Sequence, residues 1–318
     1  MPFEEGVIRQ QAETADSAII TIGRNSGEFA DRKIENDFTL SETEQTLIKN
    51  VSEIFRAKGK RVVVVLNIGG VIETASWRDR ADAILLAWQP GQEGGHAITD
   101  VISGKVNPSG KLATTFPVVY DDVPSAKTFP GKELVGVKPL IVNLFAGKPA
   151  EVRYEEGIYV GYRFYNTKNV RTAYEFGYGK SYTDFAYSDL KSSAKEFNGK
   201  ISVSVTVTNT GKRAGKEVVQ LYVSAPSAKL EKPSVELRAF AKTKLLAPGQ
   251  SETLVFSLAA DDLASFDSEL SAWIAEAGTY TVKIGASVLD IKQSATFELK
   301  KDTTVKKVGK LMLPQIKI

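Results

Sequence analysis

Hydrophobic and polar residues follow two different periods along this chain, and these periods divide it into two regions. In the first region, a short apolar strand from Asp16 to Ile22 precedes a segment whose apolar residues recur every three or four positions, as one buried helical stripe requires. Ser41 is the expected N-cap of this helix, Glu44 completes a capping box, and the helix is predicted to end near Lys58. The first region therefore begins as a strand followed by an amphipathic helix.

Two further apolar runs, Arg61 to Leu66 and Asp82 to Trp88, have the uninterrupted apolar character of strands in a parallel sheet that is covered on both faces. A crossover from Ile72 to Arg80 connects them, and a glycine-rich turn from Gly91 to His96 leads into a helix through Ile102. This order predicts a parallel α/β layer, part of a three-layer sandwich. Because three strands make a thin sheet, we expect at least one more strand to be supplied from elsewhere.

Candidate chemistry lies where the first strand ends. Parallel sheets bind ligands beyond the carboxyl ends of their strands, so the loops that start at Gly23, Asn67 and Gln89 are predicted to share one rim. The first loop carries Glu28 in a glycine-containing stretch, where backbone freedom lets a side chain be aimed at a ligand. Hydrolysis of a glycosidic bond needs two carboxyl groups, and nothing later in the chain offers an obvious second one. We therefore expect Glu28 to be one half of a catalytic pair.

The middle of the chain, from Pro117 to about Tyr182, carries prolines, glycines and aromatic residues without a clear period. A connector of this length is usually functional or disordered. Tyrosine and arginine are dense in two of its segments, Val152 to Tyr165 and Tyr174 to Tyr182. Rings with hydroxyl groups suit sugar binding, but aromatic residues also dominate packing between domains, and we favour this second interpretation.

The last region changes to the period of a β-strand. Residues Ile201 to Thr208 alternate strictly, and further strands are expected at Glu217 to Ser224, Arg238 to Leu245, Glu252 to Leu258 and Thr279 to Gly285. About seven short strands with regular turns over ~110 residues predict an immunoglobulin-like sandwich. The fold class is therefore α/β followed by all-β. The expected boundaries are 1–125 for an α/β sandwich domain that lacks its N-terminal part, 126–183 for an aromatic-rich connector with an active-site loop, 184–300 for the β-sandwich and 301–318 for a basic tail.

Composition narrows the possible partners. The 318 residues include 42% hydrophobic and 25% charged residues, and no apolar run approaches the ~20 residues that span a bilayer, so no membrane partner is expected. A net charge of +3 without a basic aromatic cluster argues against nucleic acid. The absence of cysteine excludes disulfides, thiolate metal sites and thiol nucleophiles, and the single histidine argues against a histidine-rich metal site. No signal peptide is recognisable at the N-terminus, so the compartment stays open.

Seven stretches of the chain form a recognisable series over about residues 16 to 290. They are Arg24 to Lys33, Val62 to Ile68, Trp88 to Gly95, Asn107 to Leu112, Tyr154 to Tyr165, Phe176 to Gly179, and Asn209 to Gln220. In this order they resemble the C-terminal part of a glycoside hydrolase family 3 β-glucosidase. The resemblance implies a three-domain enzyme with a catalytic barrel, an α/β sandwich and a fibronectin type III-like domain, of which this chain would contain the last two.

The resemblance also implies roles for individual residues. Glu28 corresponds to the general acid/base of the family, while the nucleophilic aspartate belongs to the barrel, which is absent here together with the first portion of the α/β domain. Phe29 and Arg32 are candidate substrate-binding residues next to it. Phe29 is expected to help desolvate Glu28, and Arg32, like Asp31 and Lys33, to be a loop anchor or a rim contact whose charge points away from Glu28. No metal or cofactor is implied. The segment from Lys132 to Ala150 departs from the short polar stretch of the family, which leaves its contact with the sugar site open.

Three interpretations of the function follow. In the first, the chain is the acid/base-bearing part of a retaining β-glucosidase that acts on a β-glucoside or oligosaccharide, with the barrel domain in a missing part of the same protein. In the second, the enzyme is split, and a separate barrel chain docks on the exposed side of the α/β sheet. Alternatively, it is a non-catalytic carbohydrate-binding or scaffolding module from a truncated glycosidase. A homo-oligomer is possible in each case. Glu93 and His96 are expected to be structural, because no P-loop lysine and serine accompany the glycine-rich turn. Trp77 and Trp88 are expected to belong to the core and not to a sugar platform.

Overall fold

A computed structural model describes residues 4–25, 31–137 and 149–310 of the chain. The chain folds into two compact units. The first contains the residues up to Ser103 together with Phe116–Gly157 and Arg171–Tyr174, and the second contains Gly104–Thr115, Ile158–Val170 and Glu175 onward. The middle of the chain therefore contributes to both units. Among the described residues, no helix is long and apolar enough to cross a membrane.

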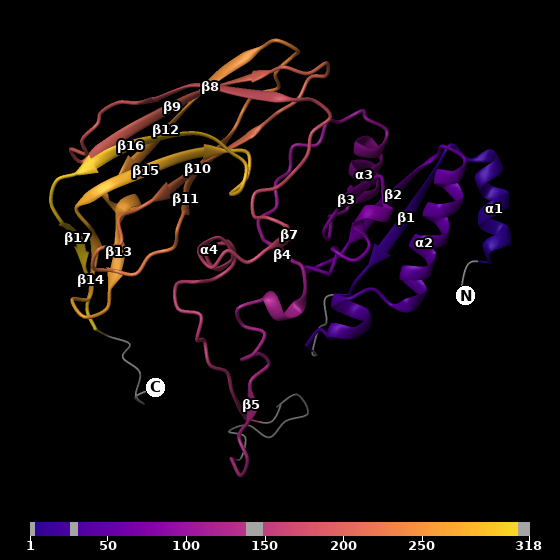
Figure 1. The fold of residues 1–318 in the computed structure, drawn as a ribbon, viewed down its shortest axis with the longest axis horizontal. Coiled ribbons are helices and arrows are strands. Elements are labelled where there is room, and N and C mark those ends of the chain that lie inside the picture. Colours follow the sequence, from indigo (N-terminus) through magenta and orange to yellow (C-terminus); the bar gives the residue numbers. More distant parts are fainter. Residues whose placement is uncertain (1–3, 26–30, 138–148, 311–318) are drawn as a thin grey trace. The chain divides into compact units, whose positions relative to one another are not determined.

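The first unit is an α/β layer (Figure 1). Its main elements are α1 (Glu5–Thr14), β1 (Ser17–Gly23), α2 (Glu42–Ala57), β2 (Arg61–Asn67), β3 (Ala83–Leu86) and α3 (Gly94–Ile102). The strands form one parallel sheet in the order β1-β2-β3, with Ile20 opposite Val64 and Val64 opposite Ile84. The predicted parallel sheet and the helix after β3 are confirmed. Helix α1 was not predicted, and between β2 and β3 the chain makes only one helical turn, Arg78–Arg80.

Helix α2 has the limits that its sequence specifies. The Glu44 N–H donates to Ser41 Oγ at 3.3 Å, and the Ser41 N–H donates to Glu44 Oε2 at 2.8 Å, which completes the predicted capping box. Gly59, with φ of +70°, follows the last turn in the left-handed conformation that glycine favours. The apolar stripe of α2 contributes to a core that is shared with the sheet and with α1, composed of Ile8, Ala12, Ile20, Ile22, Leu40, Ile48, Val51, Ile54, Phe55, Val62, Val64, Leu66, Ile68, Ile72 and Trp77.

Two short strand pairs complete the first unit. Strand β4 (Phe116–Pro117) pairs with β7 (Thr172–Tyr174), and β5 (Lys132–Glu133) pairs with β6 (Ala150–Glu151). The β5–β6 pair brackets most of the unusual segment from 132 to 150, of which residues 138–148 lie outside the described part of the chain. The described ends of this segment are largely exposed, and Val135 is 99% exposed.

The second unit is a β-sandwich (Figure 1). Its elements are α4 (Tyr162–Thr167), β8 (Phe185–Ser192), β9 (Lys200–Asn209), β10 (Val218–Ser224), β11 (Glu236–Lys242), β12 (Ser251–Ala259), β13 (Ser265–Asp267), β14 (Ala272–Ala275), β15 (Gly278–Gly285), β16 (Ile291–Leu299) and β17 (Thr303–Lys307). Within the described residues, two antiparallel sheets of orders β11-β10-β15-β16 and β12-β9-β8 contain seven strands, which agrees with the predicted number, although β8 and β16 match none of the predicted ranges.

A third small sheet, of order β13-β14-β17, adds to the sandwich unit. Its strand β17 lies within 301–318, the segment expected to be a tail, and pairs with β14 through partners such as Thr303 and Ala275. The expectation of a basic tail that stands apart from the sandwich is therefore corrected for Thr303–Lys307, which forms a strand of this sheet. Backbone hydrogen bonding to an existing edge strand decides this placement, because so short a segment has no period of its own.

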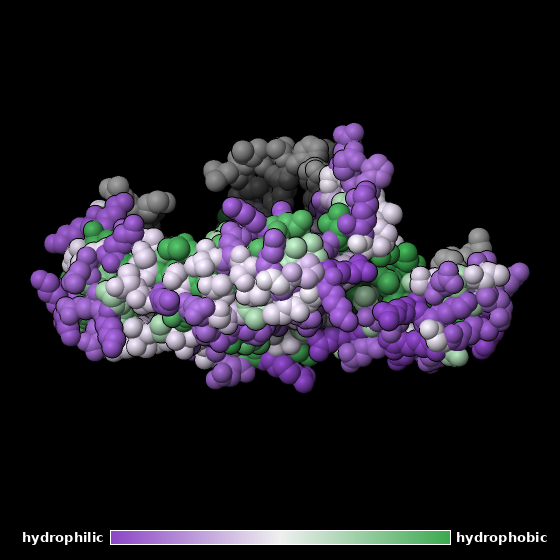
Figure 2. All heavy atoms as spheres, turned by 90° about the horizontal axis from the view of Figure 1, so that it is seen from above, coloured by the Kyte–Doolittle hydropathy of each residue, from purple (hydrophilic) through white to green (hydrophobic). Residues whose placement is uncertain are grey.

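The predicted alternation of β9 is confirmed by its burial. Ile201, Val203, Val205 and Val207 are fully buried, while the hydroxyl residues between them are only partly covered. Tyr280 and Phe297 stack between paired strands with ring centroids 5.4 Å apart, and burial raises the pKa of Tyr280 to about 12. Large apolar side chains also remain exposed, and Figure 2 shows separate apolar areas in green among the hydrophilic side chains of one face. The apolar surface is therefore scattered on this face.

One ion pair in the sandwich is completely enclosed. Lys232 Nζ lies 2.5 Å from Glu276 Oε2, and the two side chains are 1% and 2% exposed. Lys232 also donates to the carbonyl of Pro226 at 2.7 Å, and Glu276 accepts the backbone N–H of Lys229 at 2.7 Å. A charge this deeply buried is tolerated only when it is paired and hydrogen-bonded. The pair thus fixes the loop between β10 and β11 onto the segment between β14 and β15.

Replacing Glu276 by alanine should destabilise the sandwich by about 3–5 kcal/mol, because the change leaves the Lys232 ammonium buried without a counter-charge. Chemical denaturation followed by the near-ultraviolet signal of Tyr280 and its neighbours measures the loss. The control is Lys300→Ala, which breaks the exposed Lys300–Glu298 pair and should leave the transition unchanged. Equal effects of the two substitutions would contradict the role assigned to the buried pair.

Candidate active site

The segments that follow the three parallel strands are joined at the carboxyl edge of the sheet. The Arg24 N–H donates to the carbonyl of Asn67 at 3.1 Å, so that the chain leaving β1 is bound to the last residue of β2. The Asn67 side chain in turn donates to the carbonyl of Trp88 at 2.6 Å, just beyond β3. The predicted common rim is therefore confirmed for these described residues.

Two of the predicted site residues, Glu28 and Phe29, lie outside the described residues. The structure describes the chain on both sides of them, through Asn25 on one side and from Asp31 onward on the other. The described part of the candidate site therefore consists of the two ends of the loop. Each end is held by an arginine, Arg24 at the entry and Arg32 at the exit.

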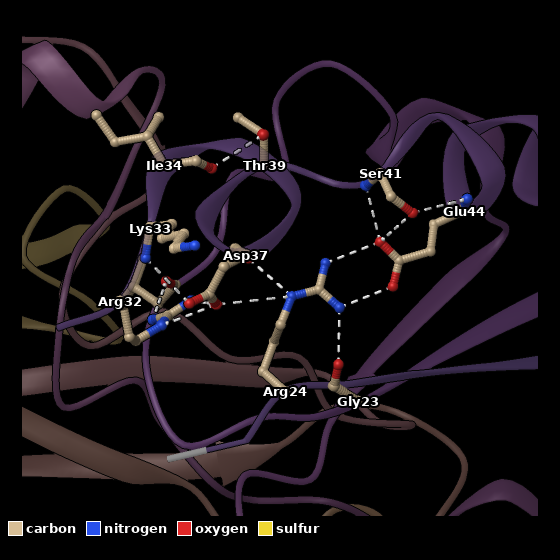
Figure 3. Close-up of polar contacts among 10 residues, drawn as sticks. Gly23, Arg24, Arg32, Lys33, Ile34, Asp37, Thr39, Ser41 and Glu44 are labelled. Atoms are coloured by element: carbon tan, nitrogen blue, oxygen red, sulfur yellow. Dashed lines mark hydrogen bonds and ion pairs between the residues drawn. The ribbon is translucent and has the colours of Figure 1, made fainter. Parts of the chain in front are cut away.

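The entry is fixed by Arg24, whose side chain is only 8% exposed. Its guanidinium makes two parallel hydrogen bonds to Glu44, from Nη1 to Oε1 at 2.7 Å and from Nη2 to Oε2 at 2.9 Å. Nε donates to the backbone carbonyl of Asp37 at 2.7 Å, and Nη1 also donates to that of Gly23 at 2.7 Å. Figure 3 shows the guanidinium between these acceptors. A bidentate arginine–carboxylate pair is among the strongest polar contacts in proteins and fixes orientation as well as distance.

Glu44 serves two structures at once. Its carboxylate accepts the Ser41 N–H that caps α2 and also accepts the Arg24 fork, so the start of the helix and the end of β1 share one side chain. Burial raises the pKa of Glu44, but the hydrogen bonds and charge of Arg24 and the hydrogen bonds of Ser41 outweigh it, and the pKa is lowered from its ordinary 4.5. Glu44 is therefore ionised at neutral pH.

The exit is fixed by Arg32. Its Nε and Nη2 donate to Asp37 Oδ1 at 3.0 and 2.7 Å, and its Nη1 donates to the backbone carbonyl of Val71 at 2.9 Å. Gly70 makes room for this contact, because a Cβ at that position would lie 2.6 Å from Arg32 Nη1. Arg32 thereby ties the loop after β1 to the loop after β2. The arrangement engages Arg32 with protein acceptors, and its contact with a substrate stays a prediction.

Asp37 receives the exit arginine within a compact turn over Ile34–Phe38, in which Asn36 adopts φ of +62°. Besides the two contacts from Arg32, Asp37 Oδ2 accepts the backbone N–H of Lys33 at 3.3 Å. Burial raises the pKa of Asp37, whereas the hydrogen bonds and charge of Arg32 lower it, and the net direction is downward from 3.8. The Asp37 carboxylate is therefore also ionised at neutral pH.

The four side chains of this cluster balance in charge. Two guanidinium groups, of Arg24 and Arg32, face two carboxylates, of Asp37 and Glu44 (Figure 3). Arg24 Nε lies 3.8 Å from Asp37 Oδ1, so the two ion pairs join into one network. The two arginines at the ends of the loop are consequently neutralised by their own partners.

The remaining candidates lie elsewhere or serve other purposes. His96 and Glu93 pair with each other at 2.7 Å on the surface of α3, with side chains 87% and 75% exposed. Trp77 is 3% exposed within the core of the first unit, and Trp88 packs partly against that core, so the prediction of core tryptophans is confirmed for Trp77. In the connector, Tyr162 stacks on Phe176 at 4.5 Å within the sandwich unit. No cluster of metal-ligating side chains occurs among the described residues.

Sequence reasoning missed the two carboxylates of the network as partners of the loop. The sequence pattern indicates only a helix-capping role for Glu44 and no role for Asp37. Both contacts join residues that no period connects, 20 positions apart for Arg24 and Glu44. The available signal is the position of Arg24 directly after an apolar strand at the carboxyl edge of the sheet, where a guanidinium with little room requires a carboxylate.

Two family models match the chain. The description of the first is "Glycosyl hydrolase family 3 C-terminal domain", over residues 5–162, and that of the second is "Fibronectin type III-like domain", over residues 217–288. The two matches fall on the α/β layer with the following connector and on the sandwich.

Similar proteins cover almost the whole chain. Beta-glucosidase A of Butyrivibrio fibrisolvens is 38% identical over 98% of this chain and 40% of its own length. A beta-glucosidase of Rhizobium radiobacter is 39% identical over 95% of the chain and 35% of its own length. The structure of beta-glucosidase 3B from Thermotoga neapolitana in complex with α-D-glucose superposes with a TM-score of 0.88 at 49% identity, over 96% of this chain and 41% of that one. The chain thus spans well under half the length of these relatives.

The Arg24–Glu44 pair should make the free energy of unfolding of the first unit depend on pH. Because the pKa of Glu44 is lowered by folding, its contribution is present above its unfolded pKa of about 4.5 and is lost as pH falls through the folded value. Glu44→Gln should therefore cost about 1.5–3 kcal/mol at pH 7, the range for hydrogen bonds to a charged group. At a pH below the folded pKa, the variant and the parent should converge.

Urea unfolding at pH 7 and at pH 3, followed by the fluorescence of the buried Trp77, measures this difference. The matched control is Glu42→Gln, which removes an exposed charge from the same first turn of α2 and reports the helix-dipole effect alone. A deficit of Glu44→Gln that persists unchanged at pH 3 would contradict the ion-pair explanation.

Proposed function

The chain belongs to glycosyl hydrolase family 3, and we propose that it is the acid/base-bearing part of a retaining β-glucosidase that hydrolyses terminal β-D-glucosyl residues. The relatives reported above are named beta-glucosidases, and they align with this chain over nearly all of its length. This agreement favours the hydrolase over the alternative of a non-catalytic carbohydrate-binding or scaffolding module.

One structural observation carries the assignment of the acid. The loop that contains Glu28 begins and ends at the carboxyl edge of a parallel sheet, and both of its ends are held there by buried or half-buried ion pairs. Ligands of open parallel sheets bind at this edge. A side chain that has to meet a sugar within a few tenths of an ångström needs a supporting shell of this kind.

The proposed chemistry requires two carboxyl groups. Glu28 would protonate the leaving oxygen of the β-glucoside and afterwards deprotonate the water that releases the sugar. A carboxylate from the part of the protein that this chain does not span would attack the anomeric carbon, and in retaining glycosidases the two carboxyl groups lie about 5–5.5 Å apart. The neutralised arginines of the loop suit this role, since an unpaired cation nearby would lower the pKa of a carboxyl group that has to be protonated.

Phe29 and Arg32 are proposed to border the sugar site. Phe29 would exclude water from the acid, and Arg32, whose side chain is 28% exposed, would contribute mainly by holding the loop. The nucleophile is proposed to come from a catalytic barrel, present in the same protein or as a separate chain. No nucleic acid or membrane partner is proposed.

Hydrolysis of a chromogenic β-glucoside tests the function directly. The purified chain is assayed alone and after mixing with the part of the Thermotoga neapolitana beta-glucosidase that it does not cover. We expect activity only in the mixture. Glu28→Gln should lower kcat/KM for a phenyl glucoside about 10²–10⁴-fold, the usual contribution of a general acid. A dinitrophenyl glucoside, whose leaving group needs no proton, should be cleaved to its covalent intermediate almost normally.

The matched control is Glu35→Gln, which neutralises an exposed glutamate in the turn that follows the same loop and should leave the hydrolysis of both substrates unchanged. Hydrolysis by the chain alone would mean that the nucleophile lies within these 318 residues and would contradict the proposal. Absence of activity in the mixture, with association of the two parts shown by size-exclusion chromatography, would support the non-catalytic module instead.

A further inference from the structure

We propose that Asp37 is a positioning residue for the acid/base loop, because this single side chain and its backbone carbonyl gather both ends of the loop. This inference rests on the proposed function for its catalytic consequence, but its structural part can be tested without it. Asp37 belongs to none of the stretches that resemble the family, and it lies nine residues beyond Glu28 in the sequence.

The first step of the argument is that one residue meets both ends. Arg24 and Arg32 are eight residues apart, a stretch that could extend over about 26–29 Å. Yet Arg24 Nε lies 2.7 Å from the carbonyl oxygen of Asp37, and Arg32 Nη2 lies 2.7 Å from Oδ1 of the same residue. Figure 3 shows both guanidinium groups directed at Asp37. The span between the two ends is therefore set by Asp37.

The second step is that Asp37 is itself held in place. Its carboxylate accepts the Lys33 N–H, and the next residue, Phe38, is 8% exposed and donates its own N–H to the carbonyl of Lys33 at 3.0 Å. The Phe38 carbonyl accepts the N–H of Glu73 at 2.7 Å, from the loop after β2. Asp37 therefore has a fixed position relative to the carboxyl edge of the sheet, and its contacts with Arg24 and Arg32 fix the ends of the loop relative to that edge.

The third step is that the exit arginine has a second, independent support. Arg32 Nη1 donates to the carbonyl of Val71 at 2.9 Å through space that Gly70 leaves open, since a Cβ at residue 70 would lie 2.6 Å from Nη1. A methyl group at residue 70 would push the Arg32 guanidinium away from the carbonyl of Val71 and so weaken the hold on the same end of the loop that Asp37 binds. Asp37→Ala removes the carboxylate that Arg32 binds, whereas Gly70→Ala disturbs the contact of Arg32 with Val71. Both variants are therefore expected to loosen the exit end of the loop, and the same effect in both would show that it comes from the lost support of Arg32 and not from a side effect of one substitution.

The matched control is Asp82. Its carboxylate accepts from Arg56 Nη2 at 3.1 Å and from the Val62 N–H at 2.7 Å, so it is also an arginine-paired aspartate that joins α2 to the sheet. It lies at the opposite end of the strands, just before β3. Asp82→Ala thus reproduces the loss of an ion pair in the same unit without touching the loop.

Hydrogen exchange of the isolated chain, followed by mass spectrometry, tests the structural part. In Asp37→Ala and Gly70→Ala, amides of residues 31–39 should exchange about tenfold faster or more, which corresponds to the loss of a hydrogen bond to a charged group. Amides of β2 should keep their rates. Asp82→Ala should leave residues 31–39 unchanged. Unchanged exchange there in Asp37→Ala, or equal acceleration throughout the unit, would overturn the proposal.

The catalytic part is tested in the assembled enzyme with two leaving groups. Asp37→Ala should lower kcat for a phenyl glucoside at least tenfold while changing kcat for the dinitrophenyl glucoside less than about threefold, because only the former needs the acid to be in place. Asp82→Ala should not separate the two substrates. Equal losses on both would overturn the positioning role, whereas failure of the unsubstituted mixture to hydrolyse either would count against the proposed function and leave the exchange result to decide on Asp37.

Discussion

A buried guanidinium is the constraint on which the first unit depends. Arg24 lies at the point where β1 ends, and its side chain is almost fully enclosed. Such a charge has to be met by a carboxylate, and Glu44 meets it with both oxygens. Because Glu44 is also part of the cap of α2, the register of the helix, the end of the strand and the entry of the loop are specified together.

The sandwich meets the same constraint with a different geometry. Lys232 and Glu276 are both nearly inaccessible, and backbone carbonyl and N–H groups complete their hydrogen bonding. Lysine offers a compact charge that suits a closed loop, whereas the planar fork of Arg24 suits two parallel bonds to one carboxylate. In both units an ion pair with at least one buried partner holds irregular backbone, where apolar packing alone does not fix the orientation of the chain.

The parts of the fold that were predictable are those with a local rule. The capping box of Ser41 and Glu44, the apolar run of β2 and the alternation of β9 are each visible within a few residues, and each is confirmed. Helix α1 was missed because its buried residues, Ile8 and Ala12, leave only a weak apolar stripe in a polar segment. Strand β17 has no signal apart from its partner. One part of the site was predictable, because the common rim follows from the topology of the parallel sheet. The pairing of Arg32 with Asp37 was not, because it depends on a turn in which Asn36 has a positive φ, and no sequence pattern indicates that conformation.

Gly70 carries a consequence for anyone who wishes to exchange this loop between homologous enzymes. The segment from β1 to α2 looks like a self-contained cassette, with an arginine near each boundary. Its exit arginine, however, occupies space that residue 70 leaves empty, and it bonds to the carbonyl of residue 71 in a different loop. If the segment from β1 to α2 were transferred to another protein, its exit arginine would lack this space unless the recipient also has glycine at the position of residue 70. The functional unit of exchange is therefore discontinuous in sequence, and it includes a position with no side chain at all.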